Sequence, residues 1–185
     1  MISLFVIIIS FFTSNSSFSE NPSYDDNNNL KAYLLSKTLE AEIDKVSTIL
    51  EITSQLPEIK KSPNATLLAE TKEMYNGISE FSDRDKRYVL KDIVLNYEDI
   101  AGAGFLMPNG DMYILEPYYK QLNLSKTNFS FRDYYKGTLD SGKIFMDDVI
   151  ISTATGKPVT ITAMPIFANT NLENNENNTN NEIAG

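Results

Sequence analysis

Apolar residues recur at helical spacing in the part of the chain that follows residue 29. They lie three, four or six residues apart and trace one stripe of an amphipathic helix, formed by Leu35, Leu39, Ile43, Val46, Leu50 and Leu56. Pro57 predicts the end of this helix, because proline lacks the N–H group that a helix interior uses. We therefore predict a long helix from about Leu30 to Leu56, with most of its stripe in the core.

Two shorter helices are predicted before residue 97. One opens at Ser62-Pro63, a capping residue followed by proline, and closes at Gly77. The other opens at Ser82, with an acidic residue three positions on as in a capping box, and ends near Asn96. The side chains expected to point inward are Leu67, Leu68, Thr71, Met74 and Tyr75 in the first helix and Tyr88, Val89, Ile93 and Val94 in the second.

After Asp99 the pattern changes to short strands separated by turn residues. Strands 101–107 and 112–116 flank Asn109-Gly110, a pair that favours hairpins because both residues accept positive φ. Strands 149–152 and 159–164 flank a Thr-Gly turn, and the second of them alternates apolar and polar residues. The predicted fold class is α+β, with a long N-terminal helix and shorter helices packed on an antiparallel sheet.

The first twelve residues are almost entirely apolar and carry no charge. As a helix they span about 18 Å, which is short for a bilayer core roughly 30 Å thick. We therefore expect residues 1–19 to be a signal peptide or a truncated membrane anchor, with an N-terminal core strand as the alternative. Residues 20–29 are expected to be a polar linker, 30–167 the folded domain, and 168–185 an Asn-rich low-complexity tail.

Composition excludes several kinds of chemistry. The chain has 16 Lys and Arg against 25 Asp and Glu, so its net charge of −9 makes nucleic acid an unfavourable partner. It contains no cysteine and no histidine, which removes thiolate and imidazole catalysis and most zinc sites. The adjacent acidic pairs Glu98-Asp99 and Asp147-Asp148 make poor acid/base couples, because neighbouring strand residues face opposite sides. We expect no catalytic activity, no cofactor and no metal.

Candidate chemistry gathers between the two hairpins, in a segment with several aromatic residues and one arginine. Arg132 could hold a carboxylate, with Tyr134 and Tyr135 against the ligand body and Tyr118 nearby, while Asp147 or Asp148 could accept from an amine. The alternative is that Arg132 pairs only with Asp133 at the surface and that the aromatic residues join the loop to the sheet.

The order of these elements resembles a Cache sensor domain over residues 30–167. The resemblance rests on the segment Phe131-Arg132-Asp133-Tyr134-Tyr135, then Asp148-Val149, Thr155-Gly156-Lys157-Pro158 and Met164-Pro165-Ile166. It implies a PAS-like antiparallel sheet outside the cell that binds small metabolites for a histidine kinase, chemoreceptor or cyclase, with pairing through the long helix.

The same resemblance assigns roles to individual residues. Arg132 and Tyr135 match the amino-acid-binding branch, whereas Tyr134 stands where tryptophan is usual and Ser152 stands where an aspartate would hold an ammonium group. A carboxylate or another small anion is therefore compatible with Arg132, whereas an amine would need Asp147 or Asp148. The expected site consists of Arg132, Tyr134, Tyr135, Tyr118, Asp148 and Ser152.

Two functions from different classes follow. The first is an extracytoplasmic, membrane-associated ligand-binding sensor of a signalling receptor, without its own transmitter. The second is a cell-surface or adhesion glycoprotein domain with no small ligand, indicated by the Asn-rich tail and by glycosylation sequons at Asn15, Asn64, Asn123, Asn128 and Asn177.

Overall fold

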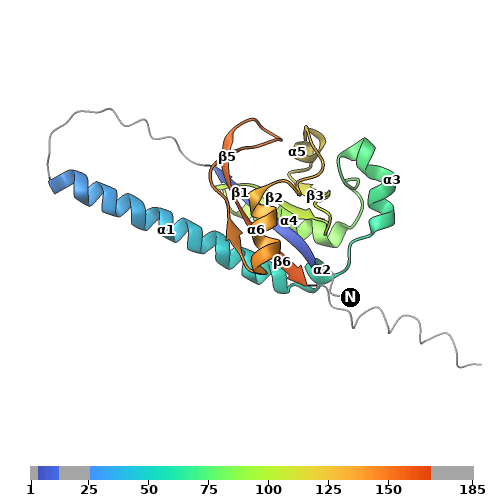
Figure 1. Cartoon of the computed structure of the whole chain (residues 1–185), viewed down its shortest axis with the longest axis horizontal. Coiled ribbons are helices and arrows are strands. Elements are labelled where there is room, and N and C mark those ends of the chain that lie inside the picture. Colours follow the sequence, from blue (N-terminus) through green and yellow to red (C-terminus); the bar gives the residue numbers. More distant parts are fainter. Residues whose placement is uncertain (1–3, 13–25, 168–185) are drawn as a thin grey trace, which may run out of the picture.

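The computed structural model describes residues 4–12 and 26–167 and confirms the α+β fold (Figure 1). Its elements, in chain order, are β1 (Leu4–Phe12), α1 (Asp26–Gln55), α2 (Pro57–Lys60), α3 (Ala65–Tyr75), α4 (Arg84–Asn96), β2 (Ile100–Leu106), β3 (Met112–Glu116), α5 (Tyr118–Leu122), α6 (Asp133–Ser141), β4 (Phe145–Met146), β5 (Ile150–Ile151) and β6 (Pro158–Phe167).

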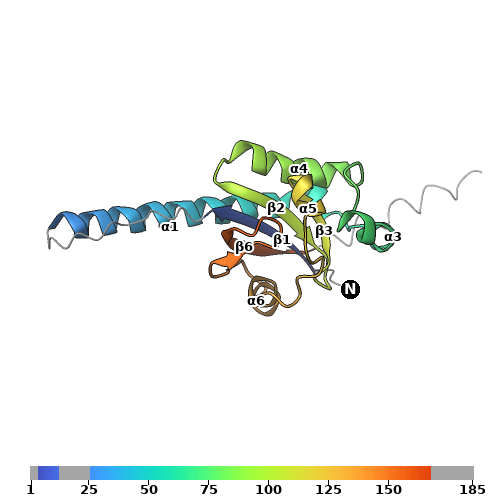
Figure 2. The same ribbon diagram turned by 90° about the horizontal axis from the view of Figure 1, so that it is seen from above.

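The strands form one antiparallel six-stranded sheet with helices on both faces. Its order is β3-β2-β1-β6-β4, with β5 also paired to β6. Figure 2 shows α6 on one face and α4 on the other. On the α4 face lies a hydrophobic cluster that includes Val46 and Leu50 of α1 and Leu90 of α4. On the α6 face lies a second cluster, which includes Tyr134 and Tyr135.

The apolar N-terminal segment lies in the sheet, as strand β1 between β2 and β6. In the structure residues 4–12 therefore form a strand, as the alternative of a core strand expects, while the leader or anchor that the sequence favours stays a prediction. The physical reason is that an uncharged run rich in β-branched and aromatic residues suits a strand paired along both edges. Residues 1–3, 13–25 and the tail 168–185 lie outside the described residues. Within the described part, no helix is long and apolar enough to cross a membrane.

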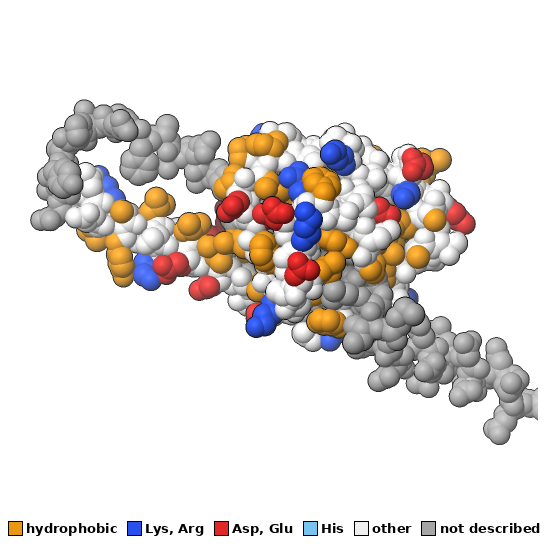
Figure 3. Space-filling view, in the orientation of Figure 1, with side chains coloured by type: hydrophobic (Ala, Val, Ile, Leu, Met, Phe, Trp, Pro, Cys, Tyr) orange, Lys and Arg blue, Asp and Glu red, His pale blue; other side chains and the backbone are white. Residues whose placement is uncertain are grey.

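Helix α1 is longer than expected, and only part of it contributes to the core. It begins at Asp26, so residues 26–29, assigned to a linker, are helical. In its second half, Val46 and Leu50 are 2% and 0% exposed, whereas Leu35 and Leu39 in the first half are 55% and 54% exposed. The first half projects beyond the sheet, and Figure 3 shows hydrophobic side chains along it. The prediction that most of the stripe is core was wrong for this half.

The helix starts differ in detail from the predicted ones. Helix α3 is capped by Asn64, whose side chain accepts a hydrogen bond from the amide of Leu67 at 2.9 Å, and not by Ser62. Helix α4 follows Asp83, which has a left-handed backbone with φ 43°, instead of a capping Ser82. Two side chains expected on buried faces are exposed, namely Met74 and Tyr88.

Of the two residues expected to accept a positive φ in the β2–β3 turn, only one has it. Gly110 has φ +85°, while Asn109 keeps a negative φ. A Cβ atom on Gly110 would lie 2.6 Å from the backbone nitrogen of Ser130, so the turn also needs glycine to let the segment before α6 approach. The aromatic segment between the two hairpins, which the sequence did not divide further, contains α5, α6 and the short strand β4.

Candidate ligand-binding site

A pocket lies on the α6 face of the sheet, beneath the β5–β6 loop and the segment that joins α5 to α6. The space between its walls, counted together with open solvent at its mouth, is about 580 Å³. Its apolar wall comes from strands and from the α5–α6 segment, and consists of Met112, Leu115, Leu124, Phe129, Val159 and Ile161. Apolar walls with a few polar groups are typical of small-molecule sites.

The free space in this pocket sets the size of ligand that fits. The cavity volume is about 50 Å³. One water needs roughly 10–15 Å³ of cavity volume, so the cavity holds roughly three to five waters. A ligand of a few heavy atoms fits without rearrangement, and a larger one requires a wall residue to move.

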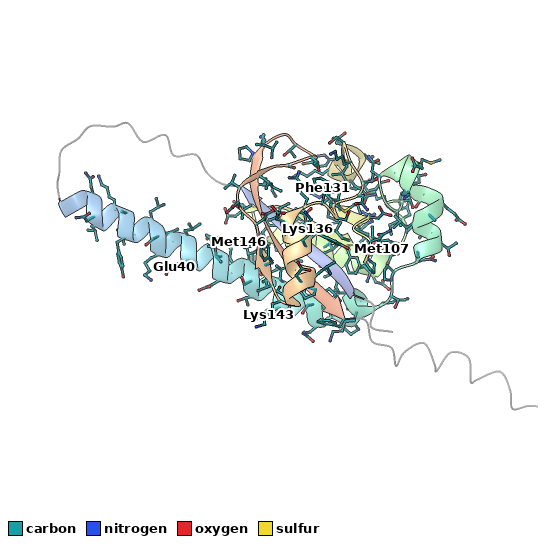
Figure 4. All side chains as sticks on the ribbon, in the orientation of Figure 1. Glu40, Met107, Phe131, Lys136, Lys143 and Met146 are labelled. Carbon is teal, nitrogen blue, oxygen red and sulfur yellow. The ribbon has the colours of Figure 1, made fainter. Side chains whose placement is uncertain are left out.

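Arg132 brings the first cation to the pocket. Its backbone has extended dihedral angles just before α6, so the side chain lies over the β5 end of the sheet, where Nη2 donates to the carbonyl oxygen of Ile151 at 3.4 Å. Its Nε is buried and has no hydrogen-bond partner among the described residues. The ring of Phe131, labelled in Figure 4, lies 5.1 Å from the guanidinium carbon. Arg132 therefore has a donor for an acceptor atom of a ligand.

Lys120 brings a second cation, which sequence reasoning did not identify. It belongs to α5, is 9% exposed, and donates from Nζ to the carbonyl oxygen of Ala101. Burial lowers the pKa of Lys120, and the positive charge of Lys157 lowers it further. Among the described residues that line the pocket, none is acidic. The two cations therefore favour an anion, which would in turn stabilise the charged form of Lys120.

A buried amide holds α5 in place and thereby positions Lys120. Gln121 is fully buried, and its Nε2 donates to the carbonyl oxygens of Tyr75 and Ile78, each at 2.8 Å. Its Oε1 accepts the amide of Leu115 at 3.0 Å. Because α5 has only five residues, these long-range bonds fix it more than its own helical bonds do.

Two further predicted residues also line the pocket. Tyr134 is 1% exposed, and burial raises the pKa of its hydroxyl, so it stays neutral. Ser152 closes the β5–β6 loop, because its Oγ accepts the amides of Ala154 and Thr155, both at 3.3 Å. The structure thus brings Arg132, Tyr134 and Ser152 together around one cavity.

Three predicted residues lie elsewhere. The Tyr135 hydroxyl donates to the carbonyl oxygen of Pro108 at 2.6 Å and ties α6 to the β2–β3 turn. The Tyr118 ring lies 5.0 Å from the guanidinium carbon of Arg87, outside the pocket. Asp148 is exposed, and neither it nor Asp147 lines the pocket, although the charge of Asp147 acts on the hydroxyl of Tyr134.

The alternative, in which Arg132 pairs only with Asp133 at the surface, is also not what the structure has. Asp133 forms its ion pair with Lys136, at 3.8 Å, one turn along α6. Arg132 instead lines the pocket, although Phe129 and Tyr135 do pack the α6 segment onto the sheet.

Comparisons with known proteins add no assignment. No family model matches the chain, and searches of curated proteins and of solved structures found no match. In residues 4–12 and 26–167, no group of three His, Cys, Asp or Glu side chains could hold a metal ion.

Proposed function

We propose that the chain is a non-enzymatic sensor domain that binds a small carboxylate in the pocket of Arg132 and Lys120. The observation that carries the proposal is the pairing of two cations with apolar walls and no acidic lining residue among those described. Charge attraction strengthens in such surroundings, because little water screens it. The resemblance of the Arg132 segment to Cache domains agrees with this function.

Size and charge together define the ligand class. The free space of about 50 Å³ suits a monocarboxylate of two to four carbon atoms. A guanidinium presents paired donors that match the two oxygens of a carboxylate. A cationic amine of the same size would meet two like charges and no acidic residue among the described lining residues.

Helix α1 is the element through which binding would be communicated. Its second half packs against the sheet, and its first half projects away (Figure 1). In this proposal the domain faces outward from a membrane and serves a histidine kinase or chemoreceptor, with a second copy paired along Leu35 and Leu39. Analytical ultracentrifugation tests the pairing: Leu35→Glu should shift a dimer to monomer, and a chain that is monomeric throughout rejects it.

A surface glycoprotein domain is the second candidate. The observation that favours it is the exposure of two sequon residues, Asn64 and Asn123. It predicts glycans at these positions and no response to any small ligand.

A thermal-shift screen of the full chain tests the proposed function. Acetate, propionate and pyruvate are compared with methylamine and glycine, each with Arg132→Gln alongside Arg84→Gln, an exposed arginine on α4. A ligand at 100 times its Kd adds about 2.7 kcal/mol, which raises the Tm by about 5–10 °C. A carboxylate response lost only in Arg132→Gln supports the sensor. A folded chain with no response, or with a response to methylamine alone, rejects it.

A further inference from the structure

Strand β1 occupies the centre of the sheet, where it separates two parts that do not otherwise pair. It runs antiparallel to both neighbours, with Ile8 opposite Gly104 on β2 and opposite Ala163 on β6. The other edge of β2 pairs with β3, and the other edge of β6 pairs with β4 and β5. Figure 1 shows β1 passing between them.

Both neighbouring strands lie in the core. All seven residues of β2 are buried, as are most of those of β6. Their backbone groups that face β1 are also away from water, and buried backbone groups require partners. Without a strand at this position the two hydrophobic clusters would be split and two long edges would be left open. The position therefore demands an apolar strand.

The composition of residues 4–12 meets this demand. The segment LFVIIISFF has no charge and is rich in β-branched and aromatic residues, as expected of a strand with both faces covered. The same composition suits a leader or a membrane anchor. These roles exclude one another, because a segment that lies in a bilayer or is removed cannot also complete the sheet.

We propose that the facing edges of β2 and β6 form a strand-binding site whose occupant is residues 4–12 of this chain. The pairing of β1 with β2 and β6 joins segments that are distant in sequence, and 13 residues separate the end of β1 from the start of α1. The segment is therefore a separable donor strand, which the rest of the chain binds through main-chain ladders on both of its edges. This proposal does not depend on the ligand proposed for the pocket.

Cleavage of the full chain tests strand binding. A specific protease sequence is placed within residues 13–25, the folded protein is cut, and the products pass through a size-exclusion column under native conditions. The N-terminal piece should co-elute with the remainder. A labelled peptide of residues 4–12 should replace it during refolding, whereas the same peptide with Ile8→Pro should not, because proline removes an N–H from a central strand. Separation of the piece under native conditions overturns the proposal, whether or not the remainder stays folded.

Hydrogen exchange on the uncut chain provides a second readout that needs no variant. The amides of Ile7, Ile8 and Ile9 should be as strongly protected as those of β2. A leader or anchor outside the sheet would leave these amides unprotected in detergent-free solution, and that result overturns the proposal. Ile8→Asp should lower the Tm several times more than Leu34→Asp, which places the same charge on the exposed part of α1.

Discussion

Arg132 contacts Ile151 through one long hydrogen bond, from Nη2 to the carbonyl oxygen at 3.4 Å, while its Nε is buried without a partner in the described part of the chain. A buried donor left unpaired costs about 1–3 kcal/mol, which offsets what the weak bond contributes. The side chain is therefore available to a ligand and adds little to the fold.

This arrangement predicts that Arg132→Gln changes the free energy of unfolding by less than about 1 kcal/mol in the absence of ligand. Urea unfolding followed by circular dichroism measures it. A loss of more than about 2 kcal/mol would show that Arg132 supports the loop, and the site would then lose its main ligand residue.

Lys86 has the opposite role, since it is fully buried and its ammonium group is occupied. Nζ donates to the carbonyl oxygens of Glu58, Ile59 and Lys61 at 2.8, 3.0 and 3.0 Å, at the end of α2. It also lies 4.6 Å from the centroid of the Phe105 ring. We predict that Lys86→Met destabilises the protein by about 1–3 kcal/mol at pH 7, because the carbonyl groups lose their donor. Lys91→Met, on the exposed side of α4, is the matched control and should change stability little.

The same residue predicts a pH dependence. Burial lowers the pKa of Lys86 to about 8 from its ordinary 10.5. Between these values the unfolded chain binds a proton that the folded chain has released, so stability rises with pH. From pH 8 to 9.5, the unfolding free energy of the wild type should rise by about 1–2 kcal/mol relative to Lys86→Met. Urea midpoints across this range measure the difference, and a difference that stays constant or falls contradicts the assigned pKa.

Local patterns predicted the long helices and the two hairpins. They did not predict which residues of α1 are buried, because burial depends on contact with the sheet, which is distant in sequence. Leu35 and Leu50 share one stripe, yet one is exposed and the other is buried. The difference arises because the sheet extends only as far as the second half of α1. For residues 4–12 the sequence left two interpretations open for a related reason, since an apolar run has the same pattern in a leader and in a central strand.

The candidate site was also predictable only in part from the sequence. Arg132 is the one arginine in an aromatic segment, and that contrast identified it. Lys120 and Gln121 carry no comparable signal, because their burial depends on α5 docking against β3 and the loop that follows α3. The position of the Tyr135 hydroxyl on Pro108 was not predictable, because a hydroxyl that joins two elements has the same sequence pattern as one that faces a ligand.

Asn128 differs from the exposed sequon residues, because its side-chain amide is held in the β2–β3 turn. Its Nδ2 donates to the carbonyl oxygen of Asn109 and to a carboxylate oxygen of Asp111, both at 2.9 Å. A glycan would replace one of these hydrogens, so Asn128 should remain unmodified in secretory expression, while Asn64 and Asn123 are accessible to modification. Peptide mass spectrometry measures occupancy, and a glycan on Asn128 of the folded protein contradicts this account of the turn.

The most direct test of the central claim is a calorimetric titration of the full chain with propionate, repeated on Arg132→Gln and on Arg84→Gln. The pocket predicts saturable binding at one site, a Kd raised at least about tenfold by Arg132→Gln, and no change with Arg84→Gln. If both variants weaken propionate binding equally, the net charge of the protein explains the effect and the pocket does not. An unchanged Kd in Arg132→Gln would contradict the assignment of the pocket.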